Sequence, residues 1–592
     1  MKKTTVKVIS SLLGVSMLGG LFACGGGGSK SDIRFTYSGS TDILSAFGKM
    51  VDEFNKTVGK KEGISVKKNP VPESGLSGVL TQRLPSKSGP DVVAILDEAF
   101  KINTKNLMDL TADIDDEFID QFYENSASRY RYNRETTTSN ATDPLYGLPF
   151  YNDTTVLYYN KTALEDQNVI CISVEEEDLA AFNSGAADEN GKTKSDYGIT
   201  IDVPARGFYR NLNPFDPAED EHDADSWIAP SEDEVLIFND RIAMSWDEIE
   251  DVGLLCTKSR NNDSITQYGY YTEWWFNYGW SVGGNCLQDV TGGGDWTYSL
   301  PSDLPNYIVN EGKTYQGKYT KKTYSAGETL DMQDIIAEEG DVLDVYFDDH
   351  SFYYTVNGQR ESVLADVLSA EKSGTLTELP SIQDAFSRFC YLAGVGGSNV
   401  CPYPSQFNSV SSYQFFASNT LGFLVERISN YDYIEKNAKF EFGIARMPVY
   451  KEYENVDDAE SEVAVKGKDT YHSFGHCLSI RKTTEKKEKA LTFLKWAVTE
   501  GQKFFAEQGY FSTRKADRDI MLAHSQYGNS EIIADSMAEA KAGDWWYMPD
   551  RSWIDNWATP LNGSVRYGSL TLQEFLYKYI EVTNTALANY KR

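Results

Sequence analysis

The chain has 592 residues, and its 56 Lys and Arg against 88 Asp and Glu give a formal net charge of −32. Since domains usually hold about 100–200 residues, this length predicts at least two lobes. The acidic balance argues against a nucleic-acid partner, which needs a basic face, and against electrostatic attachment to anionic lipid. Hydrophobic residues at 41% and charged residues at 24% are typical of a globular protein.

The first residues have the pattern of an export signal. Lys2, Lys3 and Lys7 precede a mainly apolar stretch, 8–21, that is too short for an ordinary membrane-spanning helix. The stretch ends in Leu-Phe-Ala-Cys, which resembles the lipobox of bacterial lipoproteins and makes Cys24 the predicted lipidated residue. We therefore expect a signal peptide over 1–23, a Gly/Ser tether over 24–31, and an extracytoplasmic protein anchored to the cell membrane by lipid. A plain secretory signal is the alternative.

Six further cysteines remain, and none of them lies in a CxxC motif. Their spacing gives no zinc or thioredoxin signal, so we interpret them as structural. Six cysteines allow 15 pairings, and the sequence does not choose among them; Cys390–Cys401 and Cys256–Cys286 are weak suggestions. No metal and no cofactor are predicted.

The chain that follows the expected tether is predicted to alternate strands and helices. Strands are predicted at 33–37, 64–66 and 91–96, and helices follow the first two. This β-α-β-α-β order predicts a parallel sheet with ligand contacts at the carboxyl ends of its strands. Four side chains at those ends are candidates for a ligand site, with helix capping as the alternative role: Ser38, Ser40, Asp97 and Glu98.

Several stretches then resemble one protein family. They are SGPDVVAI and MDLTADID in the first part, YGLPFYNDTTVLYYNKTALE at 146–165, SWDEIEDVGLLCTK at 245–258, FGIARMPVY at 442–450, and the block at 474–516. Together they resemble the family 1 extracellular solute-binding proteins, the carbohydrate receptors of ABC importers. The resemblance implies an α/β, two-lobe, hinged type II periplasmic-binding-protein fold, as in maltose-binding protein.

The resemblance also implies a division of the chain. Lobe I would comprise 32–150 and 474–512, and lobe II would comprise 151–473 together with the C-terminal part 513–592. Two segments that the family lacks, 168–244 and 301–378, are expected as inserts in lobe II. The first is strongly acidic, and the second is predicted to form short strands and turns.

An aromatic run at 272–285 is the strongest candidate for sugar contact. Trp274, Trp275 and Trp280 lie there among Tyr, Gly and Asn residues. A sugar stacks its apolar C–H faces on aromatic rings while its hydroxyls bond to polar groups. The alternative is a core role, and adjacent Trp274 and Trp275 cannot both face the ligand.

Other candidates come from the two expected crossovers and from the family pattern. Tyr151 and Asn152 lie on the first crossover, and Tyr471 and His472 lie on the second. Arg427 and Tyr431 occupy the region where the family often carries an aromatic cleft residue, although its usual Gly-Trp pair is absent here. His472 and His476 are four residues apart but on a predicted strand, so they are too distant to share a zinc ion. The late tryptophans at 545, 546, 553 and 557 are interpreted as core.

These observations lead to one functional hypothesis and its rivals. We expect a monomeric, lipid-anchored receptor that closes on a carbohydrate, most simply an oligosaccharide, and delivers it to the permease of an ABC importer. No catalytic motif appears in a suitable context, so no enzymatic activity is expected. The acidic run at 215–227 lacks the calcium-loop pattern and is interpreted as a solvated loop. The alternatives are an oligopeptide receptor and a surface lipoprotein that binds or processes glycans without transport.

Overall fold

The computed structural model describes residues 32–591 apart from 216–223, 348–351 and the short gaps 395–396, 404–405, 407–409, 456–457, 459–460, 509, 526 and 550. The predicted signal peptide and the whole predicted tether, including Cys24, lie outside the described residues. None of the described helices is both long and apolar enough to cross a bilayer.

A single ten-stranded sheet runs through the centre of the molecule. Its main path is β2 (Ser65–Pro70), β1 (Asp32–Tyr37), β3 (Val92–Leu96), β22 (Tyr471–Ile480), β4 (Leu148–Asn160), β18 (Leu421–Arg427) and β8 (Tyr268–Tyr271). Three short strands lie off this path: β19 (Phe442–Ala445) and β23 (Phe511–Ser512) pair with β4, and β24 (Ala540–Ala542) pairs with β22. The first three strands are parallel, which confirms the predicted β-α-β-α-β order.

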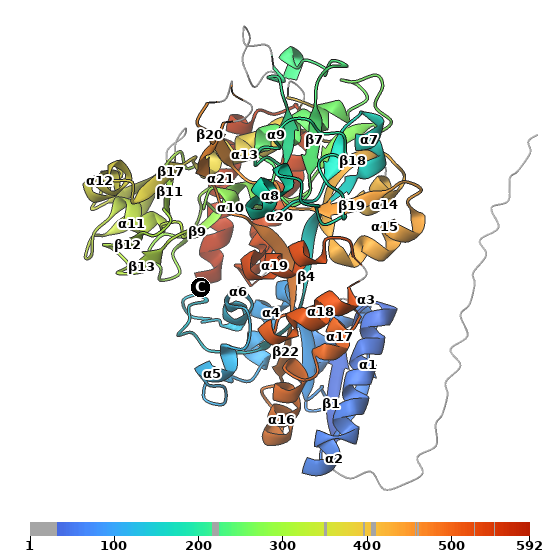
Figure 1. Cartoon of the computed structure of the whole chain (residues 1–592). Helices are drawn as coiled ribbons and strands as arrows, with labels where there is room; N and C mark the ends of the chain where they lie inside the picture. Colours follow the sequence, from blue (N-terminus) through green and yellow to red (C-terminus); the bar gives the residue numbers. More distant parts are fainter. Residues whose placement is uncertain are drawn as a thin grey trace, which may run out of the picture.

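The sheet connects two lobes that Figure 1 shows one above the other. In the lower lobe, α1 (Thr41–Lys56) and α16 (Lys487–Val498) pack on the β1–β3 strands. In the upper lobe, α9 (Trp246–Leu255) begins with a capping box in which Ser245 and Glu248 bond to each other's backbone N–H groups. The fold class predicted from the sequence, an α/β two-lobe fold, is therefore confirmed.

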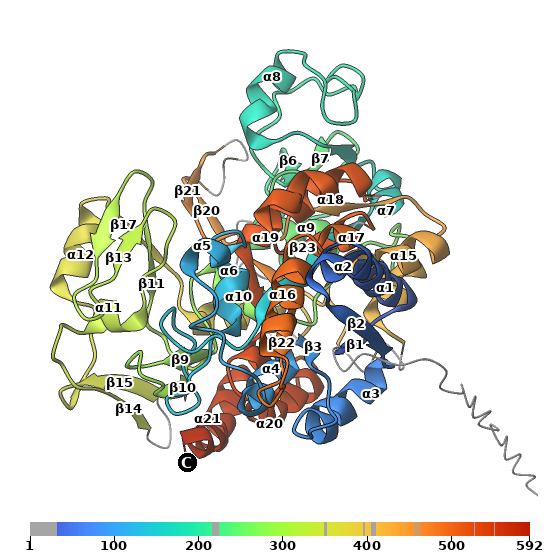
Figure 2. The ribbon, with the colours of Figure 1, turned by 90° about the horizontal axis from the view of Figure 1, so that it is seen from below.

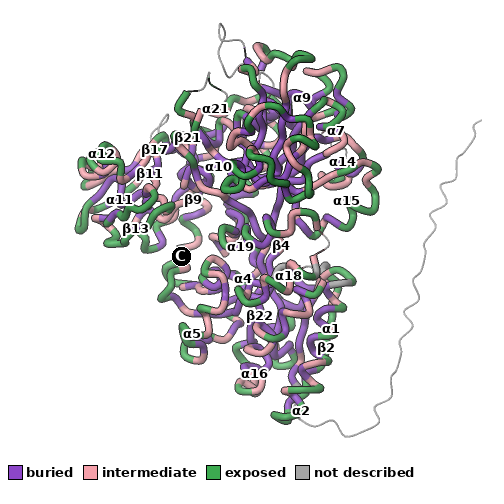
Figure 3. Tube along the Cα trace, viewed as in Figure 1, coloured by how far each residue is buried: buried purple, intermediate pink, exposed green. Residues whose placement is uncertain are grey.

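Two long strands cross from one lobe to the other. The first half of β4 pairs with β22, and its second half pairs with β18 and β19 in the upper lobe. Both strands are buried along nearly their whole length, as the continuous purple tube in the middle of Figure 3 shows. They are the strands that join the two lobes.

The segment 168–244 forms a small unit with its own sheet. Strands β5 (Ile170–Ile172), β7 (Leu236–Asn239) and β6 (Phe208–Arg210) pair in that order. A separate hydrophobic cluster that includes Phe182, Ile199 and Tyr209 packs on it. Burial of apolar side chains therefore stabilises this segment despite its acidic composition.

The segment 301–378 forms a second unit at the side of the molecule, on the left in Figures 1 and 2. It contains α11 (Met332–Ile336), α12 (Ala365–Lys372) and three small sheets: β11 (Asn306–Val309) with β17 (Leu376–Leu379), β12 (Thr314–Gln316) with β13 (Thr323–Ser325), and β14 (Leu343–Phe347) with β15 (Phe352–Val356) and β16 (Gln359–Arg360). The predicted short strands and turns are confirmed.

The C-terminal helices lie beside a short hairpin. Helices α20 (Ser552–Pro560) and α21 (Leu572–Ala588) pack together, and Asn584 of α21 accepts hydrogen bonds from the hairpin of β9 (Leu287–Asp289) and β10 (Trp296–Tyr298). The cysteines at 171, 256, 286, 390, 401 and 477 are all free thiols, so neither suggested disulfide pairing is present.

A buried carboxylate joins several elements of the lower lobe. Asp91 is 2% exposed and accepts hydrogen bonds from the Arg34 backbone N–H (2.9 Å) and the Thr484 hydroxyl (2.8 Å). Arg481 and Lys486 are also within ion-pair distance, at 3.5 and 3.6 Å. Burial alone would raise the pKa of Asp91, but these hydrogen bonds and positive charges lower it below its ordinary value.

We expect Asp91→Asn to destabilise the protein by about 3 kcal/mol, because the surrounding cations lose their buried anion. Since the pKa of Asp91 is lowered by folding, its contribution is present at neutral pH and is lost as the pH falls through the acidic range. Urea unfolding at pH 7 and pH 3 measures both effects. Asp52→Asn is the control, because Asp52 forms an exposed ion pair with Lys68 in the same lobe. Equal stability of the two variants at pH 7 would contradict the assignment.

Candidate functional site

Among the described residues, an open cavity of about 470 Å³ is lined from both lobes. Its lining comes from segments far apart in the sequence: Lys101, Ser128, Thr138, Ser139, Asn140, Gly283, Asn285, Gln288, Asp289, Gly292, Trp296, Asn306, Leu330, Asp331, Met332, Gln333, Trp546 and Tyr547. Five side-chain amides, several hydroxyls and two indoles dominate this list. Such a lining can form many hydrogen bonds and also offers flat apolar rings.

Four parts of the fold bring this lining together, and one of them is segment 301–378, which supplies Asn306 and residues 330–333. Lys101 is on α4 (Asp97–Asn103), which follows β3 in the lower lobe, and residues 128–140 follow shortly after it. The segment 283–296 follows α10 (Phe276–Ser281) and leads through the β9–β10 hairpin. Trp546 and Tyr547 belong to the C-terminal part, in and after the short 3₁₀ turn η9 (Asp544–Trp546). The lobes therefore both contribute to the cavity.

A buried lysine forms one wall. Lys101 is 3% exposed; its Nζ donates to the Tyr547 carbonyl oxygen (2.9 Å) and lies 3.6 Å from the centre of the Trp546 ring. Burial lowers the pKa of Lys101 well below its ordinary value, and the carboxylates of Asp97 and Asp143 only partly oppose this shift. Lys101 thereby fixes the position of the Trp546 indole at the cavity wall.

Asp97 lies one helical turn before Lys101 and anchors α4 to the hinge strand β22. Its carboxylate accepts hydrogen bonds from Arg129 (2.8 Å), from the Tyr130 hydroxyl (2.8 Å) and from the Gly475 backbone N–H (2.7 Å). Arg129 also donates to the Ser473 hydroxyl at 2.9 Å. The predicted candidate Asp97 is therefore fully engaged in a structural network in this conformation.

A contact between the lobes involves Trp296, which lines the cavity. The Trp296 indole N–H donates to the Thr137 carbonyl oxygen at 3.0 Å, and its ring lies 5.7 Å from that of Tyr547. Next to it, a Cβ on Gly294 would lie 1.7 Å from the Thr136 carbonyl oxygen, so only glycine permits this approach. The β9–β10 hairpin and the loop 133–143 thus form a direct interlobe contact.

An aromatic cluster surrounds His472. It includes Trp545, the residue before Trp546 of the cavity lining. This histidine is fully buried, and its ring is 4.3–5.4 Å from the rings of Phe474, Phe276, Trp545 and Trp274. Neither ring nitrogen has a hydrogen-bond partner among the described residues. Burial, together with the nearby arginines 129 and 427, lowers the pKa of His472 well below its ordinary value. The side chain is therefore neutral and acts as a packing group in this conformation.

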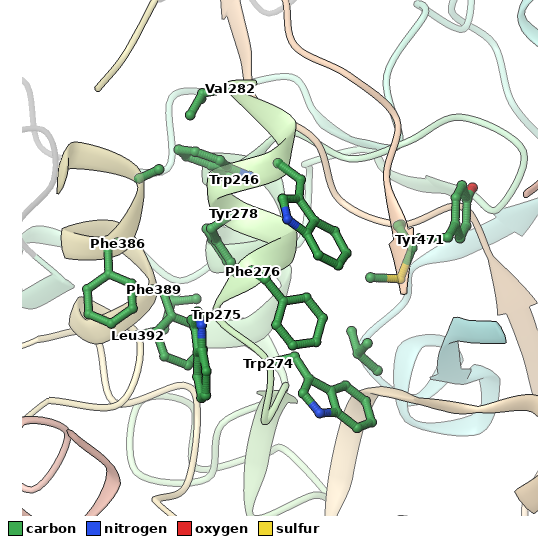
Figure 4. Close-up of a cluster of buried hydrophobic side chains, with 14 of the residues drawn as sticks. Trp246, Trp274, Trp275, Phe276, Tyr278, Val282, Phe386, Phe389, Leu392 and Tyr471 are labelled. Carbon is green, nitrogen blue, oxygen red and sulfur yellow. The ribbon is translucent and has the colours of Figure 1, made fainter. Parts of the chain in front are cut away.

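Trp274 and Trp275 take opposite directions from the start of α10. Figure 4 shows Trp275 on the side of Phe389 and Leu392, and Trp274 on the other side of the helix with Phe276. The Trp275 indole donates to the Asp544 carboxylate at 2.8 Å. Trp280 is 1% exposed and lies in the core of the upper lobe. The two adjacent tryptophans thus have different surroundings, as their spacing predicts.

The remaining predicted residues lie on or beside the strands that join the lobes. The Tyr151 ring is stacked 4.0 Å from His476 on β22, and the Asn152 amide donates to Ser126. Arg427 lies 4.6 Å from the Phe474 ring, and Tyr431 lies against Tyr527. Tyr471 is buried on β22.

Ser40 caps α1, because its hydroxyl accepts the Ile43 N–H at 3.4 Å; Ser38 is half-buried, and Glu98 is exposed. None of the predicted ligand residues is among those that line the cavity. Their contact with a ligand stays a prediction.

The sequence analysis missed the residues that line the cavity. Lys101 lies within a helical pattern, and nothing nearby in the sequence indicates its burial. For Trp546 the sequence favours a core role, like that of its neighbours, whereas the structure places it in the cavity lining. The Gly-rich stretch before Trp296 was the one local signal that could have identified a tight approach of backbone segments. The described residues contain no cluster of His, Cys, Asp or Glu that could hold a metal ion, and both His472 and His476 lie on a strand as predicted.

A second buried carboxylate lies at the start of the turn that carries Trp546 of the cavity lining. Asp544, at the start of η9, is fully buried, and one oxygen accepts hydrogen bonds from the Trp275 indole and the Cys286 thiol, both at 2.8 Å. Burial raises the pKa of Asp544 to about 6, and these hydrogen bonds and Lys541 only partly oppose the shift.

We expect Asp544 to make the protein less stable as the pH rises from about 4 to 6, because the folded state keeps a proton that the unfolded chain has released. The loss is about 3 kcal/mol, since one pKa unit corresponds to about 1.4 kcal/mol. Asp544→Asn should flatten this part of the profile, whereas Asp535→Asn, at an exposed ion pair with Arg518, should leave it unchanged. Melting temperatures between pH 4 and 8 measure the effect. A profile in Asp544→Asn as steep as that of the wild type would contradict the prediction.

Comparison with known proteins shows which family and which solved structures this chain resembles. Residues 37–236 match the model of the bacterial extracellular solute-binding protein family. A search of curated proteins finds no match. Among solved structures, an ABC substrate-binding protein of Listeria monocytogenes in complex with cycloalternan is 13% identical, with a TM-score of 0.52, and the alignment covers 95% of this chain and 100% of that one.

Two further structures are similar to the same extent. A cyclic α-maltosyl-1,6-maltose-binding protein of Arthrobacter globiformis is 12% identical, with a TM-score of 0.52 and coverage of 94% of this chain and 99% of that one. The GacH receptor of Streptomyces glaucescens, solved unliganded and with acarbose, is 12% identical, with a TM-score of 0.50 and coverage of 95% and 99%. The resemblance found in the sequence is therefore confirmed: residues 37–236 match the bacterial extracellular solute-binding protein family, and the chain around them has the fold of such proteins.

Proposed function

We propose that this protein is a carbohydrate receptor of an ABC importer, which binds an oligosaccharide between its lobes and delivers it to a membrane permease. The observation that carries the proposal is the lining of the interlobe cavity. A volume of about 470 Å³ lies within the usual range of small-molecule sites, roughly 300–1,000 Å³. The solved structures with a similar fold include complexes with cycloalternan and with acarbose, and these complexes support the same ligand class.

The chemistry of the lining suits a neutral, hydroxyl-rich ligand. The amides of Asn140, Asn285, Gln288, Asn306 and Gln333 can each donate to and accept from a hydroxyl. The indoles of Trp296 and Trp546 offer rings against which the C–H faces of a sugar can stack. Only Lys101 and two aspartates in this list can carry a full charge near neutral pH, so most of the lining is neutral.

Binding would be coupled to closure of the lobes. The lobes share β4 and β22, and the cavity lining is split between them, so a ligand that bonds to both sides favours the closed arrangement. The contact between Trp296 and the Thr137 carbonyl would add to the same closed state. An anchor at lipidated Cys24 and a monomeric receptor complete the proposal; both rest on the sequence.

A glycan panel tests the ligand class. We expect at least one oligosaccharide to raise the melting temperature and change tryptophan fluorescence. Trp546→Phe should then weaken its binding about tenfold, because the smaller ring loses stacking area and part of its attraction to Lys101. Trp496→Phe is the matched control, since Trp496 packs on Phe54 in the lower lobe, away from the cavity.

The proposal fails if no glycan produces either change, or if the two variants bind the sugar equally well. A response to oligopeptides and not to glycans would favour a peptide receptor. Released reducing sugar on incubation with a polysaccharide would favour the glycan-processing alternative.

The interlobe contact gives a second test. Trp296→Phe removes one hydrogen bond, worth about 0.5–1.5 kcal/mol, while it keeps an aromatic ring against Tyr547. We expect a larger radius of gyration in solution scattering and a severalfold weaker affinity for the ligand. Trp227→Phe is the control, because its indole donates to Asp251 within the upper lobe at 2.8 Å. Identical scattering and affinity for the two variants would show that the contact does not hold the lobes together.

A further inference from the structure

Segment 301–378 forms part of the wall of the cavity. Asn306 and Gln333, two of the residues that it contributes, are 4% and 7% exposed, so these polar side chains are almost entirely enclosed by protein. A ligand in the cavity would therefore touch this segment as well as the lower lobe. Five residues of the segment belong to the lining, from the start of β11 and from the turn that leads into α11: Asn306, Leu330, Asp331, Met332 and Gln333.

Hydrogen bonds fix the position of this part of the wall. The Gln333 side-chain amide donates to the Asp289 carbonyl oxygen of the β9–β10 hairpin at 2.6 Å, and Figure 2 shows the segment beside that hairpin. The next residue, Asp334, is fully buried, and its carboxylate accepts the backbone N–H groups of Tyr319 (2.8 Å) and Thr320 (2.9 Å). Because a buried carboxylate is costly unless it is hydrogen-bonded, this network holds α11 in one place.

Both amides use an N–H group for anchoring, which determines the direction of their oxygens. Gln333 donates to Asp289, and the Asn306 amide donates to the Pro380 carbonyl oxygen at 2.9 Å. A backbone carbonyl only accepts hydrogen bonds, so the NH₂ group of each amide must face it. Among the described residues, neither Gln333 Oε1 nor Asn306 Oδ1 accepts a hydrogen bond. Both oxygens are therefore available as acceptors for a ligand.

Asp331 adds a third acceptor beside them. One of its oxygens accepts the Tyr324 hydroxyl at 2.9 Å and lies 3.9 Å from Lys322 Nζ. The other oxygen, Oδ1, accepts no hydrogen bond from the part of the chain that the structure describes. Its neighbours Leu330 and Met332 are apolar and also line the cavity. The segment thus presents three oxygen acceptors, here called the acceptor wall (Asn306, Asp331 and Gln333), together with apolar side chains.

The charges around the acceptor wall disfavour an acidic ligand. Lys101, the cation of the lining, already donates to the Tyr547 carbonyl oxygen and lies against the Trp546 ring. Asp289 and Asp331 both line the cavity. A carboxylate on a ligand would meet two like charges there, and like charges that face each other across an interface are repelled. Groups that donate hydrogen bonds suit the same place.

We propose that the acceptor wall determines specificity: Asn306, Asp331 and Gln333 accept hydrogen bonds from the hydroxyls of a neutral saccharide and select against an acidic one. The inference rests on the proposed function and narrows its ligand class to saccharides without carboxylates. Leu330 and Met332 lie where C–H groups of the same sugar can pack. Segment 301–378 is then part of the ligand site and not only a decoration of the lobe.

Isothermal titration calorimetry of the full chain tests the acceptors, with maltotetraose, cellotetraose, xylotetraose and mannotetraose as neutral probes. We expect Asp331→Ala to bind the tightest of these about tenfold more weakly than the wild type, because a hydrogen bond to a charged acceptor is lost. Asp331→Asn should lose less affinity, because its amide keeps one oxygen acceptor. The matched control is Asp344→Ala, which removes an exposed aspartate of the same segment outside the cavity lining and should bind like the wild type.

A second pair of variants tests the anchored amide. Gln333→Met keeps the length of the side chain but removes its oxygen, so it should also weaken binding of the neutral probe severalfold. Its control is Gln316→Met, since the Gln316 amide likewise donates to a backbone carbonyl, that of Lys321 at 2.6 Å, away from the cavity. Circular dichroism and melting temperature show whether each variant is folded.

Tetragalacturonic acid tests the selection against acidic sugars. The wild type should bind it more weakly than the tightest neutral probe, and Asp331→Asn should narrow that difference, because one of the two like charges is removed. A wild type that prefers the acidic probe overturns the inference. So does binding of the neutral probe by folded Asp331→Ala and Gln333→Met that is as tight as that of the wild type; the proposed function survives both results. If none of the neutral probes binds the wild type, the proposed function fails and the inference fails with it.

Discussion

The pairing of β4 with β22 is the constraint on which the rest of the structure depends. Both lobes belong to one sheet only because these two strands lie side by side and continue into each lobe. The Asp97 carboxylate of the lower lobe holds β22 in place, because it accepts a hydrogen bond from the Gly475 backbone N–H. A Cβ at position 475 would lie within 2.7 Å of side-chain atoms of Arg129, Tyr130 and Asp97, so only glycine lets the strand come this close.

The hydrogen bond between Asp97 and Gly475 also determines the position of one cavity wall. Asp97 and Lys101 are on the same face of α4, one turn apart, so anchoring the first residue to the hinge positions the second at the cavity wall. Lys101 in turn holds the Trp546 ring. A polar network in the lower lobe thus places an aromatic ring that belongs to the C-terminal part. Since buried charged groups are costly unless paired, this network stabilises one arrangement of the three segments.

Much of the fold could be predicted from local patterns, but the site could not. The buried run at 92–96 and the Ser-Trp-Asp-Glu helix start gave the right elements, because periodicity and capping act over a few residues. The cavity depends on contacts such as that between Lys101 and Tyr547, which are 446 positions apart. No spacing rule connects such residues. The tryptophans at 274–280 suggest sugar contact by their residue type. Tertiary packing instead buries Trp275, whose indole donates to Asp544.

The turn Asp544–Trp546 has a consequence for how the two lobes communicate. Trp545 packs against His472 on the hinge strand, and the next residue, Trp546, forms the cavity wall. Adjacent side chains on one rigid turn cannot move independently, and the buried Asp544 carboxylate fixes that turn to the upper lobe. Under the proposed function, a ligand that displaces the Trp546 ring would therefore change the packing around β22. By thermodynamic reciprocity, any change in hinge angle alters the affinity at the wall by the same free energy. The turn would then couple ligand binding in the cavity to the arrangement of the lobes.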